Sequence, residues 1–334
     1  MSRLPFLAVV LAALLGAGCA SGGAAPGPLA SWHDGAARRA IVEFAGRVTD
    51  PASPDFVPEP GRIAVFDHDG TLWSESPAYF QLLFALDRVR AMAADRPEWR
   101  ETEPFASLLR GDLASAAKGG ERAVLEIVTA THAGLTAEEF DALVRAWIEA
   151  ARHPTLGRPY RDLRYRPMLE LLAYLGERGF ATYIVSGGGA DFIRPWAEEA
   201  YGIPPERVVG STIGLRYEVR DGMPVLVRLP EIDFIDEGPG KPVGIHRRIG
   251  RRPILAAGNS DGDLAMLEWT AAGPGPSLCL LVRHDDAARE WAYDRASKVG
   301  RLDRALDEAS SRGWTVVSMR EDWRSVHVRD AAAP

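Results

Sequence analysis

The sequence predicts a doubly wound α/β fold, in which helices cover both faces of a parallel sheet. Short apolar runs, rich in β-branched residues, alternate along the chain with longer stretches of helical periodicity. Strands that are separated by helices in this way pair into a parallel sheet. Several of the apolar runs also end in turns of glycine and polar residues, and ligands bind at that end of the strands in such sheets.

Length and composition are those of an ordinary globular protein. The chain has 334 residues, of which 46% are hydrophobic and 25% charged, a usual balance for a soluble domain. This length suits one large domain with an insertion, or two domains. The formal net charge of −7 provides no basic field for nucleic acid or acidic lipid, so we expect neither as a partner.

Residues 1–18 are predicted to be a secretory signal. A positive residue, Arg3, precedes an apolar run over 4–15, and small residues then lead to Cys19. The run is too short for a comfortable transmembrane helix. The layout resembles a bacterial lipoprotein signal, which implies that Cys19 becomes the lipid-modified first residue; an ordinary signal cleaved elsewhere is the alternative.

The lipoprotein resemblance also implies a location. Ala20 follows the cysteine, which in lipoproteins favours the outer membrane, so we expect a periplasmic protein that meets the membrane only through its anchor at Cys19. Residues 19–30, rich in glycine, alanine and proline, are interpreted as a flexible tether. The other cysteine, Cys279, lies in an apolar run and is predicted to be a buried small hydrophobe without a disulfide.

The first elements follow from periodicity. A helix is predicted over 31–48, with Ile41, Phe44 and Val48 on one face, and a buried strand over 62–66. From 75 to 160 the patterns are helical only, and Thr136 to Glu139 form a capping box. We interpret 75–160 as a helical cap inserted into an α/β core made of 31–74 and 161–334.

The second part of the core returns to strands. A helix over 165–178 precedes a strand over 180–185, and a further helix begins near Asp191. Alternation around Asp221 and Gly222 predicts a β-hairpin. The predicted strands and hairpin after 185 are 208–209, 213–228, 253–257, 278–282 and 315–317.

The turn after the strand over 62–66 carries two carboxylates, Asp67 and Asp69, followed by Gly70 and Thr71. Two like charges this close are costly unless a cation or a proton neutralises one of them. A solvated, aspartate-rich turn is the alternative interpretation.

Three further segments carry candidate site residues. Ser186 and Gly187 begin a glycine-rich turn whose backbone N–H groups can approach an anion at a helix start. Lys241 is a rare lysine in an arginine-rich chain and stands in a Pro/Gly turn, which indicates a compact point charge directed at a ligand. The third segment, 259–263, follows a predicted strand and is rich in oxygen ligands that suit Mg²⁺. Each of the three is also compatible with an ordinary loop.

Together, Asp67-x-Asp69-Gly70-Thr71, Ser186, Lys241 and the turn ending at Asp263 resemble the motifs of the haloacid dehalogenase superfamily, in the family's order. The resemblance covers about 60–285 and is greatest to its phosphatase branch. The helical insertion after the first motif is most similar to the phosphoserine-phosphatase group. The resemblance as a whole implies a Rossmann-like core with an inserted helical cap.

The resemblance implies a role for each motif. Asp67 would be the nucleophile that forms an aspartyl-phosphate, and Asp69 the general acid and base. Thr71, Ser186 and the backbone at Gly187 would hold phosphate oxygens, and Lys241 would neutralise charge. Mg²⁺ is the implied cofactor, with Asp67, the backbone carbonyl of Asp69, Asn259 and Asp263 as its ligands and Asp261 as a further candidate. The family usually has aspartate where this chain has Asn259, so Asp261 or Asp263 would carry more of the metal.

These motifs predict an Mg²⁺-dependent phosphatase that hydrolyses small phosphate monoesters. Dehalogenases of the superfamily lack the carboxylate at the position of Asp69, because a halide leaving group needs no proton. A phosphotransferase or phosphomutase with the same aspartyl-phosphate is the alternative within the family. The alternative outside enzymes is a binding lipoprotein in which Asn259 marks a decayed metal site.

Overall fold

The computed structural model describes residues 27–116, 118 and 120–330. The predicted signal peptide, Cys19 and most of the predicted tether lie outside these residues. No helix in the described ranges combines the length and the apolar character that crossing a bilayer requires.

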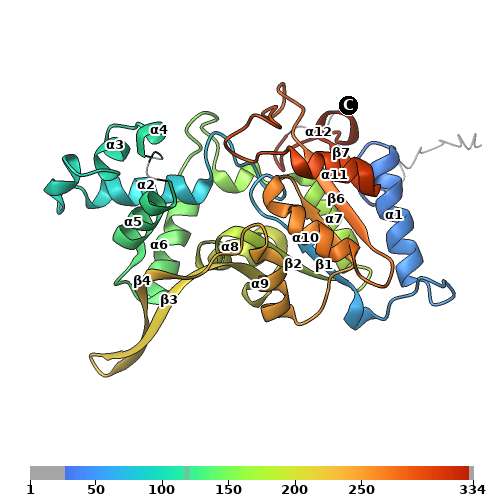
Figure 1. Ribbon diagram of the computed structural model, residues 1–334, viewed down its shortest axis with the longest axis horizontal. Helices are drawn as coiled ribbons and strands as arrows, with labels where there is room; N and C mark the ends of the chain where they lie inside the picture. The colour runs from blue at the N-terminus through green and yellow to red at the C-terminus, as the bar shows by residue number, and fades with distance from the viewer. Residues whose placement is uncertain (1–26, 117, 119, 331–334) are drawn as a thin grey trace, which may run out of the picture.

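One sheet forms the centre of the core. Within the described residues it has seven strands in the order β4-β3-β2-β1-β5-β6-β7 (Figure 1). All neighbouring pairs are parallel except β3 and β4, which are antiparallel. The doubly wound α/β fold is therefore confirmed. The strands are β1 (Ile63–Phe66), β2 (Ala181–Gly189), β3 (Val208–Arg220), β4 (Met223–Phe234), β5 (Leu255–Gly258), β6 (Leu278–Arg283) and β7 (Thr315–Ser318).

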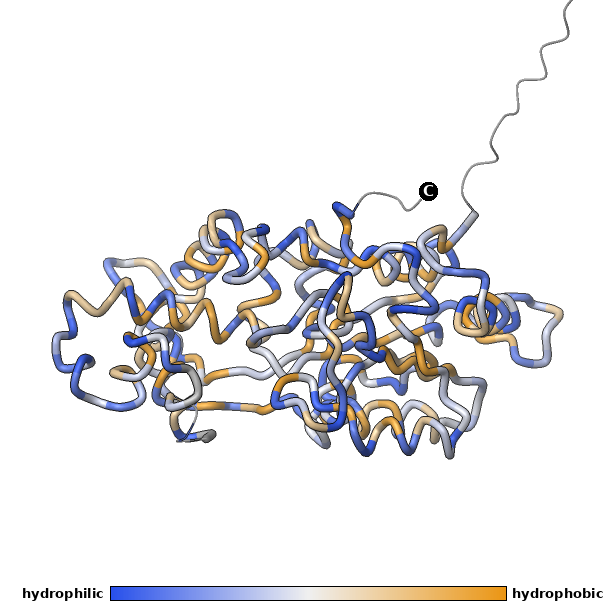
Figure 2. Tube along the Cα trace, turned by 90° about the horizontal axis from the view of Figure 1, so that it is seen from above, coloured by the Kyte–Doolittle hydropathy of each residue, from blue (hydrophilic) through white to orange (hydrophobic). Residues whose placement is uncertain are grey.

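Helices cover both faces of this sheet. In β1, Ala64 and Phe66 belong to one hydrophobic core with α1, α7 and α8, whereas Ile63 and Val65 belong to a second core with α9, α10 and α11. A parallel strand buried on both faces explains the continuous apolar run. Figure 2 shows hydrophobic stretches of chain through the middle of the molecule and hydrophilic turns at its rim. The core helices are α1 (Ala36–Thr49), α7 (Arg166–Gly176), α8 (Ala190–Tyr201), α9 (Gly240–Ile249), α10 (Leu264–Ala271), α11 (Arg304–Arg312) and α12 (Met319–Asp322).

The first helix begins later than predicted. Ile41, Phe44 and Val48 are buried on one face of α1 as expected, but the helix starts at Ala36 rather than at residue 31. The segment before it is held to the end of the chain, because His33 N donates to Asp322 O at 2.7 Å and Trp32 packs edge-on against Trp323. These long-range contacts hold Trp32 and His33 outside the helix, so the predicted first turn does not form.

Within its described residues, the segment 75–160 contains helices joined by turns and loops and no strand, and it lies to one side of the core (Figure 1). The predicted capping box is confirmed, with Thr136 N donating to Glu139 Oε2 at 2.7 Å and Glu139 N donating to Thr136 Oγ1 at 3.1 Å. Phe84 packs against Phe140 within this segment and against Phe192 of α8, which joins it to the core. The domain boundaries at 75 and 160 stay a prediction. The helices are α2 (Phe80–Met92), α3 (Phe105–Leu109), α4 (Leu113–Ala116), α5 (Gly120–His132) and α6 (Ala137–Ala150).

The hairpin differs from the prediction. The strand expected at 208–209 and the first arm of the hairpin expected at 213–228 are one strand, β3, and β4 extends to Phe234. The turn is at Asp221 and Gly222 as predicted, both with positive φ. β4 contacts the cap, where Gly134 N donates to Arg228 O and Arg228 N to Leu135 O, each at 2.9 Å. The hairpin therefore links the central sheet to the cap helices.

Candidate active site

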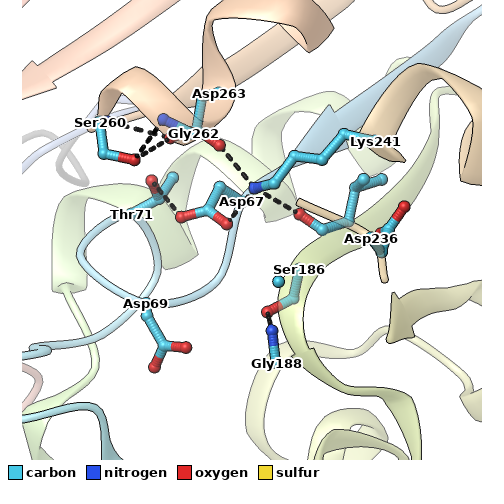
Figure 3. Close-up of polar contacts among 12 residues, drawn as sticks. Asp67, Asp69, Thr71, Ser186, Gly188, Asp236, Lys241, Ser260, Gly262 and Asp263 are labelled. Atoms are coloured by element: carbon cyan, nitrogen blue, oxygen red, sulfur yellow. Dashed lines mark hydrogen bonds and ion pairs between the residues drawn. The ribbon is translucent and has the colours of Figure 1, made fainter. Parts of the chain in front are cut away.

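Three adjacent parallel strands bring the predicted motifs to one edge of the sheet. β1 pairs with β2 on one side and with β5 on the other, with Phe66 opposite Ile184 and Ala257. Asp67 follows β1 directly, and its N–H donates to Ala257 O at 2.9 Å. Because the carboxyl ends of parallel strands meet at one edge, residues far apart in the sequence surround Asp67 (Figure 3).

Lys241 lies in the first turn of helix α9, where the sequence predicted a Pro/Gly turn. The residue is 1% exposed. The ammonium Nζ donates to Asp67 Oδ1 at 2.5 Å, to Asp263 Oδ1 at 2.6 Å and to Val185 O at 3.1 Å. All three N–H bonds of the ammonium are thus used, which fixes its position between two carboxylates (Figure 3).

Burial and charge act in opposite directions on this ion cluster. Burial lowers the pKa of Lys241, but the charges of Asp263 and Asp67 raise it by more, so it ends well above its ordinary value. Burial and the charge of Asp263 raise the pKa of Asp67, and Lys241 opposes them only in part. Lys241 therefore stays protonated, and one ammonium serves two buried carboxylates.

Asp69 points away from Asp67 into the space beside the glycines of β2 (Figure 3). Its Oδ1 accepts from Trp73 Nε1 at 2.8 Å. Burial raises the pKa of Asp69 to about 6, although the bond from Trp73 and the charge of Lys241 both lower it. A carboxyl group with this pKa can exist in both protonation states near neutral pH, as an acid–base catalyst requires.

Thr71 and Asn259 complete the inner side of the cluster. Thr71 is fully buried, and its hydroxyl donates to Asn259 Oδ1 at 3.0 Å and lies 3.3 Å from Asp67 Oδ2. The hydroxyl of Thr71 therefore lies between Asn259 Oδ1 and Asp67 Oδ2. Thr71 does not line the cavity described below, so its predicted contact with phosphate stays a prediction.

Glu75 orients the Asn259 amide, a role that the sequence analysis missed. Asn259 Nδ2 donates to Glu75 Oε1 at 2.8 Å, which leaves the amide oxygen directed at Thr71. Tyr293 OH donates to the same Glu75 oxygen at 2.6 Å. Gly70 has φ of 75°, and a Cβ there would collide with Asn259 and Glu75, so this packing needs glycine.

Asp263 and Asp261 have other partners. Asp263 Oδ1 binds Lys241, and its Oδ2 accepts from the N–H groups of Asn259 and Ser260 at 2.9 and 3.0 Å. Asp261 Oδ1 accepts from the N–H groups of Asp303 and Ala305, at the start of α11. This geometry favours Asn259 over both aspartates as a direct metal ligand.

Ser186 is buried within β2, and its Oγ accepts from Gly188 N at 3.0 Å. The glycines after it leave no room for side chains, because a Cβ at Gly187 would collide with the Glu237 carboxylate and one at Gly189 would lie 2.8 Å from Gln81 Nε2. Gly187, Gly188 and Gly189 all line the cavity, so backbone faces it here.

Asp236 is a second residue that the sequence analysis did not select. Its side chain is 0% exposed, and neither carboxylate oxygen has a hydrogen-bond partner among the described residues. Burial raises the pKa of Asp236 to about 7, with Lys241 acting against it. The signal that could have found it is its position five residues before Lys241.

A cavity of about 490 Å³ opens from this cluster toward the cap. Asp67, Asp69, Lys241 and Ser260 line one end. The rest of the wall comes from the cap helices, from α8 and from β3 and β4. The catalytic candidates are therefore open to a ligand, although most of their surface is buried.

The oxygen atoms around Asp67 fit a hard divalent cation. Within the described part of the chain, no three His, Cys, Asp or Glu side chains form a ready-made metal site. An ion would thus rely on Asp67 together with the Asn259 amide oxygen, which Thr71 holds side by side. Oxygen ligands of this kind suit Mg²⁺, which keeps several waters. Burial raises the pKa values of Asp67, Asp69 and Glu75, so their ionised forms are costly here unless a cation lies nearby.

Comparisons with known proteins agree with this architecture. A family model described as haloacid dehalogenase-like hydrolase matches residues 64–268. A conserved protein of unknown function from Anaerococcus prevotii has a similar structure, at 18% identity and a TM-score of 0.50, over 84% of this chain and 90% of that one. A protein of unknown function from Bordetella pertussis matches at 15% identity and a TM-score of 0.48, over 77% and 97%. No curated protein matches this chain. The likeness to the Anaerococcus protein concerns the fold.

Replacing Lys241 by methionine should destabilise the protein, because it leaves Asp67 and Asp263 buried without their shared cation. We expect the free energy of unfolding to fall by about 3–5 kcal/mol at pH 8. The loss should be smaller at pH 5. The pKa of Asp67 is raised in the folded state, so its protonated form stabilises the fold at low pH, and this stabilisation is lost as pH rises. Urea denaturation at both pH values measures this.

The exposed lysine Lys298 provides the matched control. Lys298→Met should change the free energy of unfolding by no more than about 0.5 kcal/mol at either pH. Equal stability of Lys241→Met and Lys298→Met at pH 8 would contradict the ion cluster described above.

Proposed function

The chain belongs to the haloacid dehalogenase-like hydrolase family, and from that premise we propose that it is an Mg²⁺-dependent phosphatase acting on phosphate monoesters. The observation that carries the proposal is the position of Asp67. Its carboxylate is bound to Lys241 at 2.5 Å, at the end of a cavity that Asp69 also lines. A nucleophile, a fixed positive charge and an acid–base group thus face one ligand space.

In the first step, an oxygen of the Asp67 carboxylate attacks phosphorus and the bond from phosphorus to the alcohol oxygen breaks. Protonated Asp69 gives its proton to the departing alkoxide, so the alcohol leaves neutral. The ammonium of Lys241 stabilises the negative charge on the transferred group. The product is an aspartyl-phosphate at Asp67.

In the second step, Asp69 is ionised and takes a proton from water as the water oxygen attacks phosphorus. The bond from phosphorus to Asp67 breaks, which releases inorganic phosphate and restores the carboxylate. Asp69 returns to its protonated form and is ready for the next ester. Its pKa of about 6 allows both roles.

Mg²⁺ would be held by the side-chain oxygens of Asp67 and Asn259 and by the backbone carbonyl of Asp69, and when bound it supplies positive charge near the phosphate. Glu75 would keep the Asn259 oxygen directed at the ion through its 2.8 Å bond to Nδ2. An amide brings no charge of its own, so Asp67 carries the ligand charge. We propose this set in place of Asp261 and Asp263.

We also propose that the protein acts outside the cytoplasm, anchored by lipid at Cys19. The support is the sequence pattern of residues 1–19 alone. Mass spectrometry of the protein from a bacterial host with a lipoprotein pathway should find acylated Cys19 as the first residue. An unmodified Cys19, or cleavage at another position, would exclude the anchor.

Asp67→Asn should abolish hydrolysis of an aryl phosphate, because an amide cannot form the aspartyl-phosphate. We expect kcat to fall by at least about 10³-fold. An excess of chelator should abolish wild-type activity, and added Mg²⁺ should restore it. Asp95→Asn, at an exposed position, serves as the control and should keep full activity. Turnover by Asp67→Asn, or full activity in chelator, would refute the mechanism.

The pH dependence should report Asp69. If protonated Asp69 is the acid, kcat/KM should decline as pH rises through about 6. Trp73→Phe removes the Nε1–H bond that lowers the pKa of Asp69, so the decline should move to higher pH. Trp269→Phe, at a tryptophan that packs on Arg252, should leave the profile unchanged. A decline at the same pH in all three proteins would assign it to another group.

A further inference from the structure

The cavity extends far beyond the space that a phosphate needs. From Asp67 and Lys241 it reaches Val128 of α5 and Phe140 of α6, and its volume is about 490 Å³. Pockets of this size usually enclose most of a ligand as large as a drug molecule. The ester of a three-carbon alcohol would leave most of this space unfilled.

The wall beyond the charged end is mainly apolar. Aliphatic and aromatic side chains from the cap, from α8 and from β4 face the cavity. They include Leu82, Ile127, Val128, Phe140, Phe192 and Ile232. A ligand that occupies this part would exchange water for apolar contacts, and the gain is proportional to the area that it buries.

Two isoleucines of the wall are left unusually open. Ile232 and Ile235 are 38% and 44% exposed. Both line the cavity beside the loop that leads to Lys241. Exposed apolar side chains that line a pocket are typical of a ligand-binding surface.

The polar residues at the far end of the cavity include a partly buried ion cluster around Asp191. Arg228 is 4% exposed, is ion-paired with Asp191, and lies with its guanidinium carbon 3.9 Å from the centre of the Phe140 ring. Burial and the charge of Arg228 lower the pKa of His132 to about 3, so its ring is neutral. Asp191 also pairs with Arg194, so two guanidinium groups share one carboxylate, and Nε of Arg228 has no hydrogen-bond partner among the described residues.

From the size of the cavity and its mainly apolar wall, we infer that it binds the alcohol part of an apolar phosphate monoester, with an alkyl or aromatic body well beyond three carbons. This inference rests on the proposed phosphatase activity and names its substrate class. The phosphate would lie at Asp67 and Lys241, and the apolar body would extend between α5, α6 and β4.

A homologous series of n-alkyl phosphates, from ethyl to octyl and below their micelle-forming concentrations, tests the inference on the wild-type protein. Each methylene buried in the cavity is worth about 0.8 kcal/mol, so kcat/KM should rise about fourfold per methylene until the cavity is filled. Phosphoserine should rank with the shortest members. A flat series, or a preference for phosphoserine, would overturn the inference.

A cavity-filling variant locates the effect. Val128→Trp should lower kcat/KM for octyl phosphate at least tenfold relative to kcat/KM for ethyl phosphate. Val219→Trp, at a position 61% exposed on the hairpin, is the matched control and should change neither. If both variants keep the chain-length preference of the wild-type protein, the alkyl chain lies elsewhere.

A binding measurement tests this inference separately from the proposed function. It uses the wild-type protein only, so the result does not depend on whether a variant folds. Calorimetry of the wild-type protein with n-alkyl phosphonates, which lack the ester bond to be cleaved, should show affinity that increases with chain length. If no ester is hydrolysed but this increase is seen, the phosphatase proposal fails and the apolar cavity stands. If esters are hydrolysed and the affinity is independent of chain length, the cavity inference fails alone.

Discussion

The ammonium of Lys241 holds together two carboxylates, Asp67 and Asp263, that the fold buries at the edge of its sheet. Burying two negative charges near each other is costly unless a fixed cation is bonded to both. Helix α9 supplies that cation from its first turn, so the helix, the strand β1 and the turn after β5 are tied to one another through a single nitrogen atom. The arrangement leaves more negative than positive charge in the cluster, which is the physical reason for expecting a divalent ion beside it.

A second set of contacts gives the site its shape. Glu75 fixes the amide of Asn259, and that amide and Asp67 meet at the hydroxyl of Thr71. Gly70 permits this packing because any side chain there would collide with it. Asn259 stands where a carboxylate is usual in the family, and the carboxylate of Glu75 fixes the orientation of its amide.

The walls of the cavity come from several elements of the fold, and no single element forms it. The cap helices and the antiparallel hairpin β3–β4 both supply parts of the wall, and the two are joined by main-chain hydrogen bonds at Arg228. Chemistry is thus fixed by the sheet edge, whereas the shape and polarity of the cavity are set by cap and hairpin. This division separates the residues of the candidate active site from the walls of the cavity.

The sequence by itself determined the parallel core, the helical character of 75–160 and the candidates Asp67 and Asp69, because each depends on local periodicity or on a short motif at a strand end. It also indicated Lys241, as a rare lysine between prolines and glycines. It also determined the capping box at Thr136, which needs only four consecutive residues. Only the tertiary structure decided that Lys241 lies in a helix and that Glu75 orients Asn259. It alone showed that Asp261 accepts hydrogen bonds from the start of α11. It also showed that the strand expected at 208–209 and the first arm of the hairpin form the single strand β3. Those facts depend on contacts between residues distant in the chain, as for Glu75 and Asn259, and no local pattern encodes the direction of a buried side chain.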